Sequence, residues 1–325
     1  MPKSKQRPAK KPVRRAPIAG SRGRGAVAKA APVRKARARD WIAAARPRTL
    51  TLAIAPVALG TGAAYLPGGG VWHEYRIALC FAVAIFIQIA VNYANDYSDG
   101  VRGTDRHRVG PARLTASGSA KPKTVLTVAM AFFALAALAG VTLVVISQLW
   151  WLLAVGVVAL IAAWFYTGGK RPYGYAGLGE LAVFVFFGLV ATIGTTYVQI
   201  EAFPGESWLT AIGMGFLACA VLVVNNLRDI EQDRLAGKRT LSVLIGPKWS
   251  RVLFTLLVLL PFLIVGLFAL VYPLAVLVFF GLLLALPAVL ITFTARTARE
   301  LILVLTLTSA LALVYGVGLA GAFAF

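Results

Sequence analysis

Long runs of apolar residues, separated by short polar segments, fill most of this 325-residue chain. Each run is about as long as the ~20 residues that a helix needs to cross ~30 Å of hydrocarbon. Only 14% of the residues are charged, against roughly 25% in an average soluble domain. The pattern predicts an all-α polytopic membrane protein with nine transmembrane helices, near residues 49–66, 76–97, 124–146, 150–166, 178–199, 208–226, 252–271, 274–294 and 301–323.

The first 40 residues differ sharply from the rest. They hold fourteen Lys or Arg, one acid (Asp40), and almost no large apolar side chain. Such a segment cannot form a core, so we expect a disordered basic tail at 1–40 and one transmembrane domain at 41–325. The tail suits attraction to anionic lipid headgroups. Because no aromatic residues are interleaved with its basic residues, we expect no nucleic-acid partner.

The basic residues also predict how the chain is oriented. Nearly all Lys and Arg outside the tail fall in the segments 98–123, 167–177, 227–251 and 295–300, whereas the intervening loops are acidic or neutral. The positive-inside rule then places these four segments and the N-terminus on the cytoplasmic face of the cell membrane.

Two acidic segments stand where apolar runs end. The first contains Asp96, Asp99 and Asp105, and the second contains Asp229 and Asp233. Residues four apart share a helix face, so Asn92 is expected to project with Asp96, and Asp229 with Asp233. Carboxylates stacked in this way repel each other unless a cation neutralises them. Mg²⁺ accepts one or two carboxylates and shares phosphate oxygens, so the pair predicts a site for Mg²⁺ and a diphosphate.

The two segments resemble each other in spacing. Asn92-x-x-x-Asp96 and Asn225-x-x-x-Asp229 follow the second and sixth runs, and a Pro-Lys pair precedes the run after each. This repetition favours two pseudo-repeated four-helix halves plus one further helix.

Simpler interpretations stay open at this point. A carboxylate cluster at a membrane surface can be a solvated loop, and Arg48 can be an anchor that reaches the interface. A divalent-cation transporter would use the same acids, but closer to the middle of the membrane. A CDP-alcohol phosphotransferase would also use Asp and Mg²⁺, but the spacing of its motif is missing after Asp99.

Several stretches resemble the UbiA superfamily of intramembrane prenyltransferases, and within it the 1,4-dihydroxy-2-naphthoate prenyltransferase branch. The similarity is carried by residues 95–105 (NDYSDGVRGTD), 225–229 (NNLRD), 236–243 (AGKRTLSV) and 179–199. It covers about residues 41–325. The superfamily spaces the acids of its first motif Asp-x-x-Asp-x-x-x-Asp, whereas here Gly103 stands in the third position.

The resemblance implies nine helices around a central cavity and an electrophilic aromatic prenylation. An allylic polyprenyl diphosphate would donate its prenyl group to 1,4-dihydroxy-2-naphthoate, with loss of CO2 and diphosphate, giving demethylmenaquinol for menaquinone biosynthesis. A prenyltransferase with another aromatic acceptor would share these motifs. Beyond the two substrates and the lipid bilayer, no obligate protein partner is evident.

The roles implied for individual residues fall into three groups. Asp96, Asp99, Asp229, Asp233 and Asp105 would hold Mg²⁺. Lys170, Arg228 and Arg102 would stabilise the departing diphosphate, Lys170 because the family's Tyr-x-x-x-Lys element falls on Tyr166 and Lys170. Asn92, Arg48, Tyr166, Asn225 and Lys238 would bind substrate.

Overall fold

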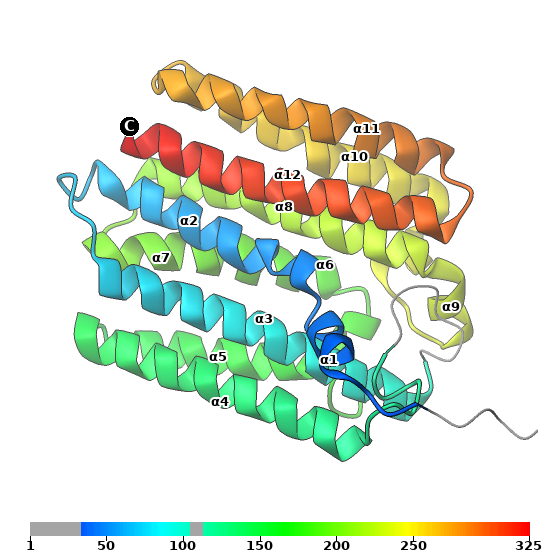
Figure 1. Ribbon diagram of the computed structural model, residues 1–325. Helices are drawn as coiled ribbons and strands as arrows, with labels where there is room; N and C mark the ends of the chain where they lie inside the picture. The colour runs from blue at the N-terminus through cyan, green and yellow to red at the C-terminus, as the bar shows by residue number, and fades with distance from the viewer. Residues whose placement is uncertain (1–33, 105–112) are drawn as a thin grey trace, which may run out of the picture. The chain divides into compact units, whose positions relative to one another are not determined.

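A computed structural model describes residues 34–104 and 113–325, and within these two ranges the chain is helical with no β-strand (Figure 1). In chain order the elements are α1 (Ala38–Ala44), η1 (Pro47–Thr49), α2 (Thr51–Tyr65), α3 (Glu74–Arg102), α4 (Pro122–Ser147), α5 (Leu152–Phe165), η2 (Tyr173–Tyr175), α6 (Gly179–Val183), η3 (Phe184–Val190), α7 (Ala191–Ile200), α8 (Gly205–Arg228), α9 (Ile230–Leu235), α10 (Leu241–Ala269), η4 (Pro273–Gly281), α11 (Leu282–Thr294) and α12 (Ala298–Ala324).

Seven helices in the described part of the chain are long and apolar enough to cross a membrane. An eighth is added if α1–η1 and α2, which meet at a bend of 45°, count as one span; α5, with 14 residues, is shorter. Each of the nine predicted apolar runs coincides with a helical segment, so the all-α membrane class is confirmed. The count of nine crossings and the division into repeated halves stay predictions.

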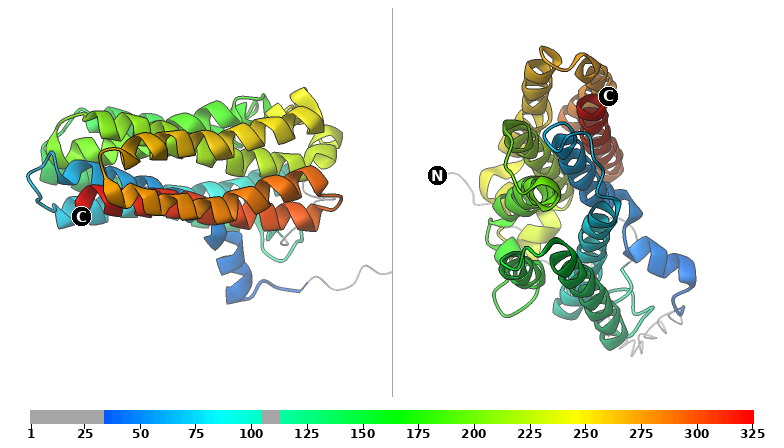
Figure 2. Two further views of the ribbon diagram at one scale, coloured as in Figure 1. Left: turned by 90° about the horizontal axis from the view of Figure 1, so that it is seen from above. Right: turned by 90° about the vertical axis from the view of Figure 1, so that its left-hand side faces the viewer.

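The long helices lie side by side in one bundle (Figures 1 and 2). Helix α3 packs against α4, α2 packs against α12 and α7, and α8 packs against α10, α12 and η3. In Figure 1 and in the right-hand view of Figure 2, α4 and α5 lie at one edge and α10 and α11 at the other. Of the predicted tail, residues 1–33 lie outside the described residues, while α1 already begins at Ala38.

Small residues let the central helices approach closely. A Cβ added at Gly188 would lie 2.6 Å from the Cα of Gly215, and one added at Gly60 would lie 2.2 Å from the carbonyl oxygen of Thr192. Helices in membranes commonly associate through such contacts, because apolar side chains gain little by leaving lipid. Gly188 lies in η3, a π-helical segment that joins α6 to α7 in one continuous helix and carries cavity-lining residues.

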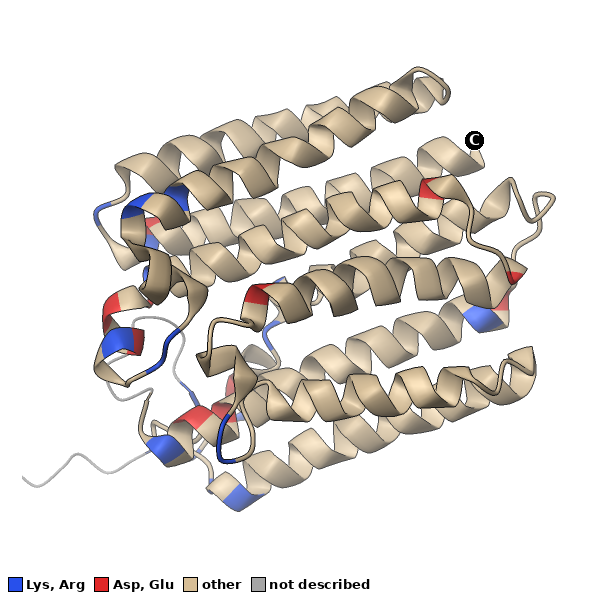
Figure 3. Ribbon diagram, turned by 180° about the vertical axis from the view of Figure 1, so that it is seen from behind, with Lys and Arg blue, Asp and Glu red and all other residues tan. Residues whose placement is uncertain are grey.

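Charge and apolar exposure agree with a membrane environment. Leu263, Phe280 and Leu283 are each more than 65% exposed, as expected for side chains that contact lipid. Most Lys, Arg, Asp and Glu lie at the end of the bundle that carries α1 and α9, and few lie at the opposite end (Figure 3). Both acidic segments therefore belong to the same end of the bundle.

Candidate active site

A cavity of about 700 Å³ runs between α2, α3, α5, the α6–η3–α7 helix and α8. Along α3 its lining changes from Asn92, Asn95 and Asp99 to Val83 and Cys80. At 1.5 Å per helical residue, the distance from Asp99 to Cys80 corresponds to about 28 Å along the axis. The cavity thus has a polar end, where both acidic segments lie, and a long apolar arm.

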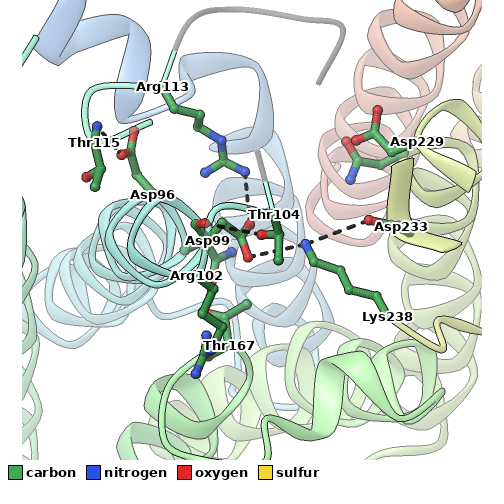
Figure 4. A network of polar contacts seen from close by, with 12 residues as sticks. Asp96, Asp99, Arg102, Thr104, Arg113, Thr115, Thr167, Asp229, Asp233 and Lys238 are labelled. Carbon is green, nitrogen blue, oxygen red and sulfur yellow. Dashed lines mark hydrogen bonds and ion pairs between the residues drawn. The ribbon is translucent and has the colours of Figure 1, made fainter. Parts of the chain in front are cut away.

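One lysine bridges the two acidic segments at the polar end (Figure 4). The ammonium nitrogen of Lys238 lies 3.2 Å from Oδ1 of Asp99 and 3.7 Å from Oδ1 of Asp233. It also lies 4.5 Å from the centre of the Tyr175 ring. Asp99 and Asp233 are 134 residues apart in the sequence. In the structure both carboxylates face the same ammonium group from opposite sides.

Asp99 is buried and is contacted from three directions. Besides Lys238, Arg113 lies 3.5 Å from its Oδ2, and the Tyr175 hydroxyl donates a hydrogen bond to its Oδ1. Burial raises the pKa of the Tyr175 phenol, and the neighbouring Asp99 charge raises it further. The phenol consequently stays protonated and keeps donating to the carboxylate.

The second acidic segment forms its ion pair locally. Helix α8 ends at Arg228, Asp229 has φ −100° and ψ 9°, and α9 starts at the next residue. The Arg228 guanidinium donates to both carboxylate oxygens of Asp229, at 2.7 and 2.5 Å, and to Oδ1 of Asn225 at 2.9 Å. Arg228, Asn225 and both aspartates of this segment line the cavity, as the predicted site requires.

Asp96 does not line the cavity that Asp99, Asp229 and Asp233 line. Its Oδ2 accepts from the backbone N–H of Leu114 at 2.9 Å and its Oδ1 from that of Thr115 at 2.8 Å (Figure 4). The side chain is 1% exposed and does not line the cavity. The expectation that Asp96 projects with Asn92 is therefore wrong: Asn92 donates to the Ala45 carbonyl oxygen and lines the cavity, while Asp96 holds the turn after residue 113.

The residue that accompanies Asp99 in the cavity is Asn95, which sequence reasoning missed. Asn95 and Asp99 both line it, one helical turn apart, and the Thr167 hydroxyl donates to Oδ1 of Asn95 at 2.5 Å. The signal was present, because Asn95-x-x-x-Asp99 has the same spacing as Asn225-x-x-x-Asp229. The pair that matches Asn225 and Asp229 is thus Asn95 and Asp99, three residues after the pair that the sequence analysis had aligned with them.

Two of the predicted basic residues lie outside the cavity lining. Arg102 donates to the carbonyl oxygens of Thr167 and Gly169 at 2.6 and 2.5 Å, so it braces the loop after α5. Lys170, in the same loop, is exposed. Among the described residues, neither contacts a carboxylate of the acidic segments, and no contact there supports their predicted role on diphosphate.

Two further predicted substrate-binding residues lie at the cavity. Arg48 and Tyr166 line the cavity, and Arg48 donates to the Thr306 hydroxyl at 3.5 Å. Asp105 lies outside the described residues. Arg113 and Tyr175 were missed, because nothing in their local sequence indicates that they meet Asp99.

The donors at the polar end fit a hard divalent cation shared with a ligand better than a closed protein cage. Among the residues that the structure describes, no three Asp, Glu, His or Cys side chains form a preassembled metal cluster. Yet Asp99 and Asp233 already face one ammonium group, and Asp229 lines the same end. Mg²⁺ is commonly held in proteins by one or two carboxylates completed by water and phosphate oxygens, and these carboxylates suit it.

Comparison with known proteins identifies the fold and the family. The model of the UbiA prenyltransferase family matches residues 53–302. The chain belongs to this family. A UbiA homologue from Aeropyrum pernix K1 superposes with a TM-score of 0.63 at 16% identity, over 83% of this chain and 96% of that one. A UbiA homologue from Archaeoglobus fulgidus, described as bound to DMAPP and Mg²⁺, gives 0.55 at 17% identity, over 87% and 99%.

Curated UbiA relatives extend the similarity at the level of sequence. A protein of Mycobacterium tuberculosis named 1,4-dihydroxy-2-naphthoate octaprenyltransferase is 49% identical over 88% of this chain and 97% of its own length. A protein of the same name from Escherichia coli is 38% identical over 65% of this chain and 70% of its own. The chain therefore aligns with almost the whole length of the mycobacterial enzyme.

Proposed function

We propose that this UbiA-family protein transfers a polyprenyl group from an allylic polyprenyl diphosphate to 1,4-dihydroxy-2-naphthoate. Diphosphate and CO2 leave, and the product is demethylmenaquinol, the precursor of menaquinone. The observation that carries the proposal is the cavity, in which two acidic segments and their basic partners meet at the end of an apolar arm. The choice of acceptor is supported by the mycobacterial relative, whose name includes 1,4-dihydroxy-2-naphthoate and which aligns with this chain over 97% of its own length.

The polar end would bind the diphosphate. Asp99, Asp229 and Asp233 would hold Mg²⁺, which when bound neutralises the diphosphate and favours its departure. Arg228 and Lys238 stand beside these carboxylates with donors that match phosphate oxygens. Preorganised positive charge at the point where negative charge develops is commonly the largest single contribution to such a reaction.

The apolar arm would hold the prenyl chain and exclude water. Val83, Phe186 and Val190 line it, from α3 and η3. An allylic group that leaves diphosphate is strongly electrophilic, so water in the arm would divert it to an alcohol. The polyprenyl donor is itself a lipid. A cavity between membrane helices would therefore let the donor enter directly from the bilayer.

We further propose that the N-terminus and the polar end face the cytoplasm in the cell membrane. The proposal is supported by the gathering of charge at this end of the bundle (Figure 3) and by the positive-inside rule. K248C, in the basic segment 227–251 and with Cys80 and Cys219 both changed to alanine, should react with an impermeant maleimide only in inside-out vesicles. Labelling of intact cells would contradict the orientation.

The reaction is tested with purified protein in detergent or nanodiscs, Mg²⁺ and allylic diphosphates of several chain lengths. Each donor is offered with dihydroxynaphthoate or with 4-hydroxybenzoate, and products are identified by mass spectrometry. We expect a prenylated naphthoquinol that lacks the carboxyl group, detected as such or as the quinone formed from it by oxidation in air. Prenylation of 4-hydroxybenzoate alone, or no product from any pair, would contradict the proposed function.

A further inference from the structure

One buried carboxyl group is not part of the diphosphate site. Glu180, in the first turn of α6, is 8% exposed. Its Oε1 accepts from Nδ2 of Asn226 at 3.0 Å, and its Oε2 is buried without a hydrogen-bond partner. In the described chain no Lys or Arg forms an ion pair with it, unlike Asp99 and Asp229. Such burial is costly, so a role for this group is to be expected.

The partner of Glu180 lies on the cavity wall. Asn226, in the last turn of α8, lines the cavity and is 9% exposed. A carboxylate only accepts hydrogen bonds, whereas an amide donates from nitrogen and accepts at oxygen. The contact with Glu180 therefore fixes the amide with its nitrogen toward α6, which leaves the Oδ1 oxygen as the acceptor for a ligand in the cavity.

The wall around this amide suits a flat aromatic molecule. Tyr166 and Leu222 line the cavity beside it, and a Cβ added at Gly179 would lie 3.4 Å from the Tyr166 hydroxyl and 3.3 Å from Leu222. The Tyr166 ring is itself held edge-on by Tyr173, with centroids 5.6 Å apart. An aromatic ring, an apolar side chain and one oriented hydrogen-bond acceptor thus stand on the same wall.

We propose that Asn226 accepts a hydrogen bond from a hydroxyl group of the aromatic acceptor, and that Glu180 is the positioning residue that holds its amide for this contact. The proposal rests on the proposed function and adds a location for the acceptor. It places the phenolic substrate on the wall formed by α6 and α8, beside the diphosphate site on α3 and α9.

Kinetics with the two substrates varied separately test this assignment. E180A should raise the KM for dihydroxynaphthoate about five- to tenfold, the range for loss of one oriented hydrogen bond, and leave the KM for the prenyl diphosphate within about twofold. E180Q should keep both values within about twofold, because a glutamine oxygen still accepts from Asn226. N226A should match E180A, and the double variant should be no worse than N226A.

Glu206 offers a matched control. It also follows a glycine in the first turn of a helix, α8, and accepts from a neighbouring side chain, the Tyr272 hydroxyl at 3.1 Å, but it does not line the cavity. E206A should change neither KM. Thermal unfolding and binding of dihydroxynaphthoate by fluorescence quenching are measured for every variant, so that a poorly folded E180A is recognised and E180Q and N226A still decide.

The outcomes separate this inference from the proposed function. If the wild type prenylates no naphthoate, the proposed function fails. If the wild type is active but E180A raises both KM values alike, or neither, the positioning role is overturned. A KM of E180Q for dihydroxynaphthoate as high as that of E180A would also overturn it, because that result requires the charge of Glu180 itself.

Discussion

The two acidic segments reach the same cavity by different structural means. At the end of α3, Asn95 and Asp99 lie in an uninterrupted helix, and the partners of Asp99 come from elsewhere in the chain: Arg113 and Lys238. At the other segment the helix breaks at Asp229, whose ion-pair partner Arg228 is its neighbour in sequence. Among the contacts of the described residues, Asp99 is therefore held by tertiary partners, whereas Asp229 is held by its sequence neighbour at a break in the helix.

This difference has a consequence for how each segment responds to substitution. Lys238 is the only ion-pair partner that the described residues give to both segments. A change there should affect both at once, whereas a change at Arg228 acts first on Asp229.

Loss of either central carboxylate should have the largest effect. D99N and D229N should each lower kcat/KM at least about 100-fold, because even outer-shell partners of a metal contribute 10- to 100-fold. E231Q is the matched control, since Glu231 is exposed and pairs only with Arg234 among the described residues. An active D229N beside an inactive D99N would break the equivalence of the two segments.

Removal of the shared lysine should come next. K238A should raise the KM for the prenyl diphosphate about 10- to 100-fold, as expected when a hydrogen bond between charged groups worth ~1.5–3 kcal/mol is lost. K248A, an exposed lysine in α10 that does not line the cavity, serves as the control. A K238A enzyme with an unchanged donor KM would show that the lysine only fills space between the carboxylates.

Within the first acidic segment, Asp96 should contribute to stability and not to metal binding. D96N should lower the free energy of unfolding by about 1–3 kcal/mol. In the wild type two backbone N–H groups donate to the two carboxylate oxygens, whereas in D96N one of them would face the amide nitrogen, which is itself a donor. The affinity of D96N for Mn²⁺ should stay within about threefold of wild type, whereas D99N should lose binding. Thermal unfolding and Mn²⁺ titration measure the two effects, and loss of Mn²⁺ binding in D96N would restore Asp96 as a ligand.

The smallest effect is expected at Lys170. K170A should change the donor KM by less than about twofold, because the side chain is exposed and outside the cavity, where single charges contribute little. Steady-state kinetics with the prenyl diphosphate varied provide the check. A tenfold rise in KM would mean that the loop after α5 moves Lys170 onto the diphosphate during binding.

The sequence alone was sufficient for the large-scale features. Apolar runs predict helices in lipid because each backbone polar group must be bonded within its own segment, and every predicted run contains a helix. Charge at matching helix ends predicted that Asp99 and Asp229 share one cavity. Both were inferences from physical constraints that act along the chain.

The side-chain orientations could not be predicted in the same way. Asn92-x-x-x-Asp96 and Asn95-x-x-x-Asp99 have the same spacing, and only the packing of α3 decides that Asp99, and not Asp96, lines the cavity. The contact between Glu180 and Asn226 joins residues 46 apart, and nothing in either local sequence indicates it. Family resemblance placed Lys170 near diphosphate, whereas its exposure in the structure depends on how the 166–178 loop folds.

Calorimetric titration of Mn²⁺ and pyrophosphate into wild type, D99N, D229N and the double variant tests most directly whether both acidic segments bind one ligand. We expect each single variant to lose binding of Mn²⁺ with pyrophosphate, and the double variant to lose no more, because the one shared site is already destroyed. Two independent sites, with each single variant keeping one of them at wild-type affinity, would contradict it.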